Sequence, residues 1–410
     1  VCHYLMIGEL GLDGCVHNVN GVLAMVLEGR RQGITRFIVP KGNASEAALV
    51  SGVEIYGVST LLEALLFLQG QVRIEKEKQH MGQWKQVTVA KDFKDVAGQK
   101  MMKRAMEIAV AGMHHLLIIG APGSGKTMAA SRLPGIMPEL TWEEQLEITR
   151  LYSICGMLSP ESPIVRERPF RAPHHTLTPT ALTGGGRVPV PGELSLASKG
   201  VLFLDELPEF SRETLEVLRQ PLEEHKVRIA RVGHAYEYPC DCLLVAAMNP
   251  CRCGNFHNKR NCRCTVGEIR KYLNKISEPL LDRMDLCVES EPPEFFLGTG
   301  QEESSETIRI RVNEAVKHQQ QRYEKETFSF NGELNEKNIY KYCPLTESQK
   351  DFLHDVYVEN EMSMRQLNKM IKVARTIADL NGNEEISDDD LAESICFRSI
   401  NKKYWGDVLC

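Results

Sequence analysis

The sequence lacks an apolar run long enough to cross a membrane, and its N-terminus has no basic-then-apolar signal pattern. Internal repeats and low-complexity tracts are also missing. The formal net charge is only -6, which excludes a general polyanion binder and leaves nucleic-acid contact to local basic loops. These absences predict an intracellular, cytoplasmic protein. The chain begins VCHYLMIGEL without an initiator Met, so we expect a fragment of a longer protein.

What is present is typical of a globular protein with two or three domains: 410 residues, 42% hydrophobic and 25% charged. Residues 1–72 alternate strand-like and helix-like runs, which predicts a small α/β unit, and the charged stretch 73–91 suits a linker. Residues 92–300 carry most of the candidate chemistry and are expected to start with one helix over 92–112. Residues 301–410 are helical in pattern. Their apolar stripe consists of Leu367, Met370, Ile371, Ala374 and Ile377.

A glycine-rich segment follows a predicted strand at Leu116–Ile119 and precedes a helix-forming run, MAASRL. It reads GAPGSGKT and matches G-x-x-x-x-G-K-[ST], in which glycines let backbone N–H groups surround phosphate oxygens. Its lysine is expected to reach the β- and γ-phosphates of a nucleotide, and its threonine to ligate Mg²⁺. The flanking strand and helix disfavour a simple glycine turn. The residues expected to bind the nucleotide are Gly120, Gly123, Ser124, Gly125, Lys126, Thr127 and Met128.

Two further apolar runs end in polar side chains. Val201–Leu204 leads into Asp205 and Glu206, at the edge where ligands bind in open α/β sheets. Asp205 is expected to hold Mg²⁺ together with the threonine, and Glu206 to orient and polarise the attacking water. Leu243–Met248 ends at Asn249, whose amide is expected to contact the γ-phosphate or the water. In isolation these would be an acidic turn and an Asn-Pro turn, but the upstream phosphate loop favours a site.

Four of the thirteen cysteines form two C-x-C pairs joined by a short polar loop: Cys251, Cys253, Cys262 and Cys264. Four thiolates can close a tetrahedral Zn²⁺ site, and a metal would fold a loop with almost no apolar residues. His257 is a competing ligand. The alternative is four reduced surface thiols, which would be prone to oxidation. We therefore predict a structural zinc insertion at about residues 250–266.

Several of these segments together resemble a known family. GAPGSGKT, VLFLDELPEF, AAMNPC and SEPLLDRMDL, in this order, are similar to motifs of the magnesium-chelatase-like branch of the AAA+ ATPases. RPFRAPHHT, PVPGELSLASKGVLFLDELPEF and KVARTIADL narrow the resemblance to the ComM/YifB family of bacterial competence proteins. The resemblance covers nearly the whole chain. It implies an α/β fold: a P-loop AAA+ core with a parallel sheet over residues 92–300 and a helical lid over 301–410.

The resemblance assigns roles to two arginines that the residue pattern alone does not mark. Arg283, in LLDRMD, matches the arginine finger that enters the neighbouring subunit's active site, where a guanidinium neutralises charge on the transferred phosphoryl. Arg365, in SMRQL, matches the second sensor and is expected to contact the nucleotide of its own subunit. Arg375 is the alternative for that role. Without the resemblance, surface salt bridges would be the simpler interpretation. The family implies six subunits.

Basic segments near the ATP motifs are the expected contacts for a polymer. In AAA+ proteins, insertions at these places project into a central pore, where Lys and Arg would grip a phosphate backbone. Lys226–His234 alternates like a hairpin. The alternative is that the first segment packs the core and that the charges are solvated. The side chains concerned are Arg166, Arg168, Arg171, His174, His175, Arg187, Lys226, Arg228, Arg231, His234, Arg252, Lys259, Arg260 and Arg263.

The N-terminal unit, residues 1–72, resembles the C-terminal part of a Lon-type protease domain. Lon proteases use a Ser–Lys pair, in which the lysine assists attack by the serine. The matching segment GVLAMVLEG contains no lysine, and the serine half would precede residue 1. We therefore expect a partial Lon-like domain that is not proteolytic and acts as a scaffold or gate.

The combined expectation is an ATP-driven, hexameric DNA translocase or helicase that uses ATP, Mg²⁺ and structural Zn²⁺ and acts on single-stranded and branched DNA. In the family this means branch migration while incoming DNA is recombined during natural transformation. The alternative is a chelatase-like ATPase that remodels a protein partner in metal insertion and is indifferent to DNA. A non-hydrolysing scaffold is disfavoured because Lys126, Asp205, Glu206 and Arg283 are all present.

Overall fold

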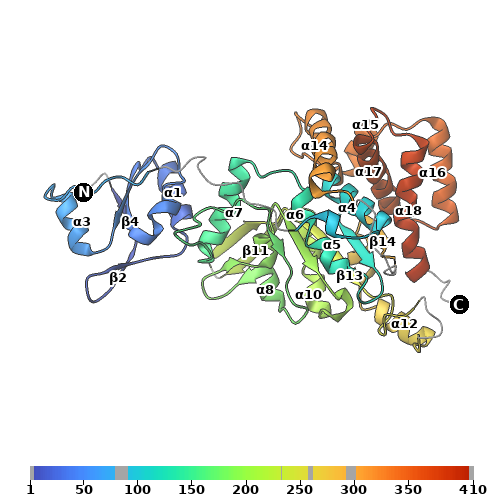
Figure 1. Ribbon diagram of the computed structural model, residues 1–410, viewed down its shortest axis with the longest axis horizontal. Helices are drawn as coiled ribbons and strands as arrows, with labels where there is room; N and C mark the ends of the chain where they lie inside the picture. The colour runs from blue at the N-terminus through green and yellow to red at the C-terminus, as the bar shows by residue number, and fades with distance from the viewer. Residues whose placement is uncertain (1–3, 79–90, 232, 257–261, 292–301, 406–410) are drawn as a thin grey trace.

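A five-stranded parallel sheet forms the centre of the molecule (Figure 1). The computed structural model describes residues 4–78, 91–231, 233–256, 262–291 and 302–405, apart from the side chains of residues 399, 401 and 402. The strand order is β14 (Leu286–Glu289), β6 (Leu116–Ile119), β13 (Leu243–Met248), β10 (Val201–Leu204) and β7 (Phe170–Arg171). Every residue of the three middle strands is buried, as parallel strands covered on both faces should be. The predicted α/β class and the three predicted apolar strands are confirmed.

Helices cover both faces of this sheet, and alternate side chains of β6 show it. Leu116 and Ile118 pack into one core, with helices α4 (Lys100–Gly112) and α6 (Leu133–Ile136). Leu117 and Ile119 pack into the other core. The helical elements of this second face are α8 (Pro179–Thr183), α9 (Glu193–Leu196), the 3₁₀ turn η3 (Leu207–Glu209), α10 (Arg212–Glu216), α11 (Arg219–Glu224), α12 (Val266–Leu273), α13 (Glu278–Leu281) and the end of α18 (Asp388–Trp405).

The single helix expected over residues 92–112 is wrong in its first eight residues. A 3₁₀ turn, η2 (Phe93–Asp95), is capped by the side chain of Asp92, and α4 begins only at Lys100. Gly98 and Gln99, just before α4, have φ values of 62° and 54°. This left-handed conformation interrupts a right-handed helix, and the amphipathic pattern alone did not reveal it.

Five helices at the C-terminal end form the lid, the orange and red part of Figure 1. They are α14 (Ser305–Arg322), α15 (Glu336–Tyr342), α16 (Glu347–Glu359), α17 (Met364–Leu380) and α18 (Asp388–Trp405), with the 3₁₀ turn η4 (Asn331–Glu333). The predicted stripe lies on α17: Met370 and Ile371 are buried in the lid, and Ile377 is buried against the core. The helical pattern is therefore confirmed. Within the described residues, no helix combines the length and apolarity that a membrane crossing needs.

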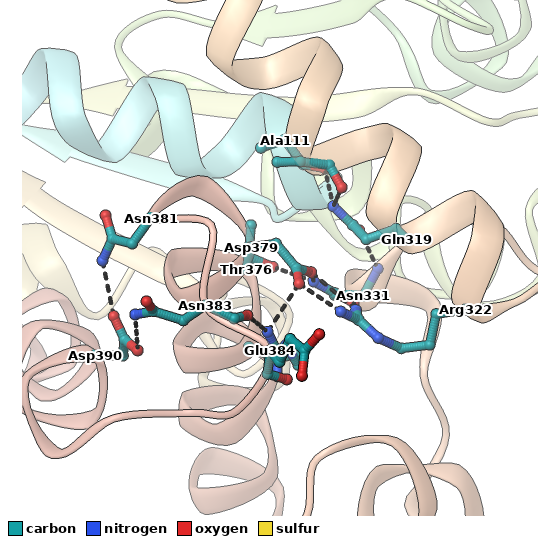
Figure 2. Close-up of polar contacts among 12 residues, drawn as sticks. Ala111, Gln319, Arg322, Asn331, Thr376, Asp379, Asn381, Asn383, Glu384 and Asp390 are labelled. Carbon is teal, nitrogen blue, oxygen red and sulfur yellow. Dashed lines mark hydrogen bonds and ion pairs between the residues drawn. The ribbon is translucent and has the colours of Figure 1, made fainter.

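Asp379 is the centre of a buried polar network in the lid (Figure 2). Its carboxylate pairs with Arg322 at 2.5 Å and with Arg375 at 2.9 Å, and it accepts a hydrogen bond of 2.9 Å from Asn331 Nδ2. Arg375 also donates to two backbone carbonyl groups of the following turn. Since Arg375 is only 1% exposed, it serves the interior of the lid, and the alternative sensor role expected for it is not supported.

The N-terminal residues fold into a small α/β unit, as the alternating pattern predicted. Its parallel sheet has the order β1, β4, β5, and its core includes Trp142 and Ile164 of the following domain. Gly21 N–H donates to the Ser153 carbonyl at 2.9 Å, which joins the unit to α7 (Trp142–Ile154). Most of the expected linker lies outside the described residues. The elements are β1 (Leu5–Met6), β2 (Glu9–Leu10), β3 (Val16–His17), α1 (Val22–Arg31), β4 (Arg36–Pro40), η1 (Lys41–Asn43), α2 (Ala44–Ala47), β5 (Glu54–Val58) and α3 (Leu61–Leu68).

Two antiparallel hairpins project from the second face of the core. One pairs β8 (Gly184–Gly185) with β9 (Val190–Pro191), and the other pairs β11 (Lys226–Arg231) with β12 (His234–Pro239). The hairpin predicted from Lys226 onward is confirmed. Arg231 donates to the Gly186 carbonyl at 3.3 Å, so the two hairpins touch near their tips.

Candidate functional site

The glycine-rich segment forms a tight turn between β6 and the short helix α5 (Lys126–Ala130). Gly123 and Gly125 have φ values of 77° and 83°, which other residue types rarely adopt. Gly120 has no room for a side chain, because a Cβ atom there would lie 1.6 Å from the Ser290 hydroxyl. Ser124 hydrogen-bonds to that same hydroxyl at 2.7 Å. A backbone of this form can surround an anion with successive N–H groups.

The ammonium group of Lys126 lies at the centre of the site. It donates to the carbonyl oxygens of Gly120 and Ala121 at 2.8 Å each and to Asn249 Oδ1 at 3.4 Å. Burial lowers the pKa of Lys126, and the charge of Asp205 partly opposes this. Asn249 directly follows β13, so the structure brings the lysine beyond one strand together with the amide beyond the neighbouring strand.

Thr127 and Asp205 form a short polar contact beside this lysine. Thr127 Oγ1 donates to Asp205 Oδ2 at 2.5 Å, and Asp205 Oδ1 accepts a hydrogen bond of 2.8 Å from the backbone of Glu206. A hydroxyl and a carboxylate are hard oxygen donors of the kind that Mg²⁺ prefers. The residues present therefore fit a magnesium ion, and the adjacent turn and ammonium fit the phosphates of a nucleotide. Met128, the last predicted nucleotide contact, is 42% exposed in α5.

Glu206 is exposed beside this pair, and its carboxylate lies 3.3 Å from Nδ1 of His175. His175 in turn packs against His174, with 4.0 Å between the ring centroids. The sequence interpretation placed both histidines among the polymer contacts and missed the pairing with Glu206. The pairing follows from the register of β7 with β10, in which Arg171 lies opposite Leu202. The register of β7 with β10 could not be predicted from the sequence.

Arg283 and Arg365 line a single cavity of about 470 Å³ between the core and the lid. His115, which immediately precedes β6, also lines it, whereas the phosphate turn follows β6. As far as the chain is described, the lining includes none of residues 120–128 and neither Asp205 nor Glu206. The structure therefore brings the two arginines together, and it places them at the opposite end of β6 from the phosphate turn of their own chain.

The guanidinium of Arg283 is held by its own chain. Nε donates to the Arg219 carbonyl at 3.1 Å, one terminal nitrogen donates to the Pro279 carbonyl at 2.6 Å, and the other pairs with Glu223 at 2.5 Å. The side chain is 13% exposed. A guanidinium has five N–H donors, so two of them have no partner among the described residues beyond these three contacts.

Arg365 is exposed in the first turn of α17, and within the described residues it makes no hydrogen bond or ion pair. The expectation that it contacts the nucleotide of its own subunit does not agree with this placement. The physical reason is the anchoring of α17 at the amino end of β6, where His114 Nε2 lies 2.7 Å from Thr376 Oγ1. Arg365 consequently shares a cavity with Arg283.

The four clustered cysteines converge, with their sulfur atoms all within 4.8 Å of one another. Cys251 Sγ lies 3.4 Å from Cys253 Sγ and 3.9 Å from Cys262 Sγ. Burial raises the pKa of Cys251 to about 12, whereas a backbone hydrogen bond from Asn255 lowers the pKa of Cys253 to about 6. Four converging sulfur donors fit a tetrahedral zinc ion. Three loop residues considered from the sequence lie outside the described residues: His257, Lys259 and Arg260.

The basic side chains predicted to contact a polymer lie in different surroundings. Arg168 donates to the carbonyl groups of Pro138 and Lys199, and Arg171 pairs with Glu193 at 2.6 Å. For these two arginines, the alternative that the first basic segment packs into the core is therefore correct. Exposed basic side chains lie on the hairpins and the cysteine loop: Arg187, Arg228, Arg231, Arg252 and Arg263.

Comparison with known proteins agrees with this architecture. Three family models match: "Magnesium chelatase, subunit ChlI" over residues 92–295, its C-terminal domain over 302–398, and "Subunit ChlI of Mg-chelatase" over 2–43. YifB of Salmonella typhimurium is 40% identical over 403 residues, which cover 97% of this chain and 78% of YifB. Competence protein ComM of Haemophilus influenzae is 40% identical over 405 residues, covering 96% and 77%. DNA helicase MCM8 of Gallus gallus is 26% identical over 188 residues, covering 46% and 19%.

Proposed function

The chain belongs to the ComM/YifB family of magnesium-chelatase-like AAA+ proteins, and from that premise we propose that it hydrolyses ATP within a homo-oligomeric ring to move DNA. One observation carries the ATPase part. Lys126 lies 3.4 Å from Asn249, and the adjacent Thr127 lies 2.5 Å from Asp205, although the phosphate turn, Asp205 and Asn249 follow three different strands. Those strands, β6, β10 and β13, are adjacent in the sheet, and their carboxyl ends form the edge where ligands bind in such folds.

Each side chain at this edge has its own task in the proposed reaction. The turn and Lys126 hold the β- and γ-phosphates, and Thr127 and Asp205 hold Mg²⁺. When bound, the metal neutralises charge on the phosphate oxygens. Glu206 orients the attacking water and accepts its proton, and Asn249 fixes the water or the γ-phosphate by a hydrogen bond.

The arginines are proposed to act on the neighbouring subunit's nucleotide. The cavity that Arg283 and Arg365 line lies at the end of β6 away from the phosphate turn, so neither is placed to serve its own site. In the proposed head-to-tail ring, this face would meet the next subunit's phosphate turn. Two guanidinium groups there would neutralise charge that develops on the transferred phosphoryl. Six subunits is the number that the family resemblance suggests.

Complementation between variants tests the shared site. Lys126→Ala removes the ammonium, and Arg283→Ala removes the guanidinium. Each variant alone is expected to lose ATPase activity. After the two variants are mixed and exchange subunits, ATP turnover should return at those interfaces between neighbouring subunits, called seams here, where an intact phosphate turn meets an intact Arg283. Random assortment makes about one seam in four of this kind. If the mixture hydrolyses ATP no faster than the separate variants, the shared-site proposal is wrong.

DNA is the proposed substrate. The proposed reaction is branch migration while incoming DNA is recombined during natural transformation. Exposed arginines near the touching hairpin tips, Arg187 and Arg231, support it, with Arg252 and Arg263 of the cysteine loop. Guanidinium groups of this kind bind phosphates without reading sequence. The similarities to a competence protein and to part of a DNA helicase point the same way.

The remaining parts have supporting roles in this proposal. Cys251, Cys253, Cys262 and Cys264 bind one structural zinc that folds the insertion at about residues 250–266. Residues 1–72 form a partial Lon-like unit that lacks proteolytic activity, and 73–91 form the linker. Residues 92–300 are the ATPase core and 301–410 the lid. The whole assembly acts in the cytoplasm.

The second candidate is a chelatase-like ATPase that remodels a protein partner for metal insertion, favoured by the family models that match the core and lid. The two functions differ in their response to DNA. ATP turnover should rise when single-stranded DNA is added at low salt, and particle size should increase with ATP and a branched DNA. If DNA neither binds at low salt nor changes turnover, the DNA function is wrong and the chelatase-like alternative is the better account.

A further inference from the structure

Asp285 lies two residues after Arg283 and joins the start of β14 to the start of β6. Its backbone N–H donates to the His115 carbonyl at 2.9 Å, and His115 N–H donates to its carboxylate at 3.2 Å. The side chain is 11% exposed. Burial alone would raise the pKa of Asp285, but the charge of Lys369 and the neighbouring His114, whose Nδ1 lies 3.4 Å from Oδ2, outweigh it and hold that pKa well below its usual range. An ionised carboxylate therefore lies two residues after Arg283 and lines the same cavity.

Lys369 is the cation that meets this carboxylate, with its Nζ atom 2.9 Å from Oδ1. It lies four residues after Arg365 in α17, so the two side chains leave the same face of the helix one turn apart. The ammonium also lies 3.5 Å from the Met284 carbonyl, to which Arg398 of α18 donates as well. Two lid helices therefore hold the segment that carries Arg283.

A second contact links α17 to Asp285 through His114, whose Nδ1 lies 3.4 Å from Asp285 Oδ2. Thr376 Oγ1 lies 2.7 Å from His114 Nε2 and accepts a hydrogen bond of 2.9 Å from Asn331 Nδ2. Asn331 Nδ2 also lies 2.9 Å from Asp379, so the anchor is continuous with the buried network of the lid (Figure 2). The two hydrogen bonds of Asn331 therefore connect η4 with α17 in the buried interior of the lid. The lid is thereby joined to Asp285 directly through Lys369 and indirectly through Thr376 and His114.

We infer that Lys369 is a positioning residue: its ion pair with Asp285 sets the spacing between Arg283 and Arg365, so that both reach the same nucleotide of the neighbouring subunit. This inference rests on the proposed function. It concerns geometry across the seam, because Lys369 itself is tied to Asp285 and does not need to touch the nucleotide. Displacing reacting or stabilising groups by about 1 Å can lower turnover on the order of a hundredfold.

Lys372 provides a matched control. It lies on the same helix, lines the same cavity, and its pKa is lowered by burial, as that of Lys369 is. Its ammonium donates to the Gly332 carbonyl at 3.1 Å and, as far as the chain is described, forms no ion pair with a carboxylate. Lys372→Met therefore removes a half-buried cation from the cavity without freeing Asp285.

The first experiment compares ATPase kinetics of the assembled full chain. Lys369→Met is expected to lower kcat at least about tenfold while the KM for ATP changes less than about twofold, because the phosphate turn lies at the other end of β6. Lys369→Arg, which keeps the cation, should restore most of kcat, and Lys372→Met should stay close to wild type. Equal losses in Lys369→Met and Lys372→Met would overturn the inference.

The second experiment mixes Lys369→Met with Lys126→Ala and runs the Arg283→Ala plus Lys126→Ala mixture beside it. If Lys369 acts across the seam, the first mixture regains activity, because Lys126→Ala subunits supply well-placed arginines to the intact turns of Lys369→Met. Restoration also shows that Lys369→Met folds. Restoration in the Arg283 mixture alone rejects the role of Lys369 and leaves the proposed function intact. Failure of both mixtures rejects the shared-site function itself.

Discussion

Thr127 Oγ1 and Asp205 Oδ2 lie 2.5 Å apart although their strands are not neighbours in the sheet. Strand β13 lies between β6 and β10, and the contact reaches across its end. Ala246 of β13 is opposite Leu204 on one side and Leu117 on the other, so two strand registers together set the contact. A one-residue slip in either register would move Asp205 by about 3.3 Å and destroy the candidate magnesium site.

Glu206→Gln tests the catalytic assignment at this edge. The amide keeps the shape of the side chain but cannot accept the proton of the attacking water, so kcat should fall by roughly 10² to 10⁴. ATP binding should change little, because Lys126 and the turn are untouched. Steady-state turnover and equilibrium binding of ATP measure the two effects.

The matched control for this substitution is Glu209→Gln. Glu209 lies three residues further along, is exposed, and pairs with Lys275 at 3.2 Å. Its replacement should leave turnover unchanged. Wild-type turnover in Glu206→Gln would mean that the catalytic assignment is wrong.

Removal of metal tests the cysteine cluster. We expect about one zinc per chain by elemental analysis, released by a strong chelator together with a loss of order in the insertion. Cys262→Ser should bind less metal. Cys155 lies at the end of α7 with its thiol 3.8 Å from the Pro191 carbonyl and is not part of the cluster, so Cys155→Ser should bind as much as wild type. Less than about half an equivalent of zinc in protein purified without chelator would rule the site out.

Asp379→Asn tests the buried polar network of the lid. It leaves two arginine side chains, Arg322 and Arg375, without their shared carboxylate, and breaking a buried ion pair in this way costs about 3–5 kcal/mol. Urea unfolding followed by circular dichroism measures the loss. Glu347→Gln, which removes an exposed pair with Lys350 on α16, should have no measurable effect. Equal stability of the two variants would contradict the structural role of Asp379.

His115 predicts a pH-dependent stability. Burial lowers the pKa of His115 from 6.5 to about 4, so the folded chain binds this proton more weakly than the unfolded chain. Its contribution to stability is complete above pH 6.5, falls as the pH drops toward 4, and is constant below that. The free energy of unfolding should decrease by at most about 3 kcal/mol over this range from this group.

His115→Asn removes the titrating imidazole and leaves the other groups in place. In the structure the backbone N–H of Leu244 donates to His115 Nδ1 at 3.2 Å, and the Asn side chain keeps an acceptor for it. Urea unfolding of both proteins between about pH 7 and pH 5 should show a shallower decrease for the variant, by about 2 kcal/mol. Other groups, including His225, whose pKa is raised by Asp241, contribute equally to both proteins. Parallel curves would show that His115 is not held neutral by burial.

Local motifs in the sequence were sufficient for much of the candidate site. The GAPGSGKT turn, Asp205 and Asn249 each sit directly after an apolar run, and parallel strands place their carboxyl ends together. The cysteine spacing likewise predicted a cluster. These inferences succeed because each depends on a few consecutive residues and on a general property of parallel sheets.

Other features depend on contacts between distant segments and could not be read from the sequence. The pairing of His175 with Glu206 follows from strand register, and the position of Arg365 follows from the docking of α17 on His114. The early start assigned to α4 failed for a local reason, because left-handed dihedral angles at residues 98 and 99 leave no trace in hydrophobic periodicity.

Strand β6 has only four residues, all fully buried, yet it separates the phosphate turn from the His114–Asp285 junction. A strand of that length spans about 13 Å and is too closely packed to bend independently of its neighbours. Because β14 and β13 pair with it on its two sides, the sheet fixes the distance between its two ends. A substitution that changed the length or register of this strand would therefore alter the distance between its two ends without replacing a residue at either end.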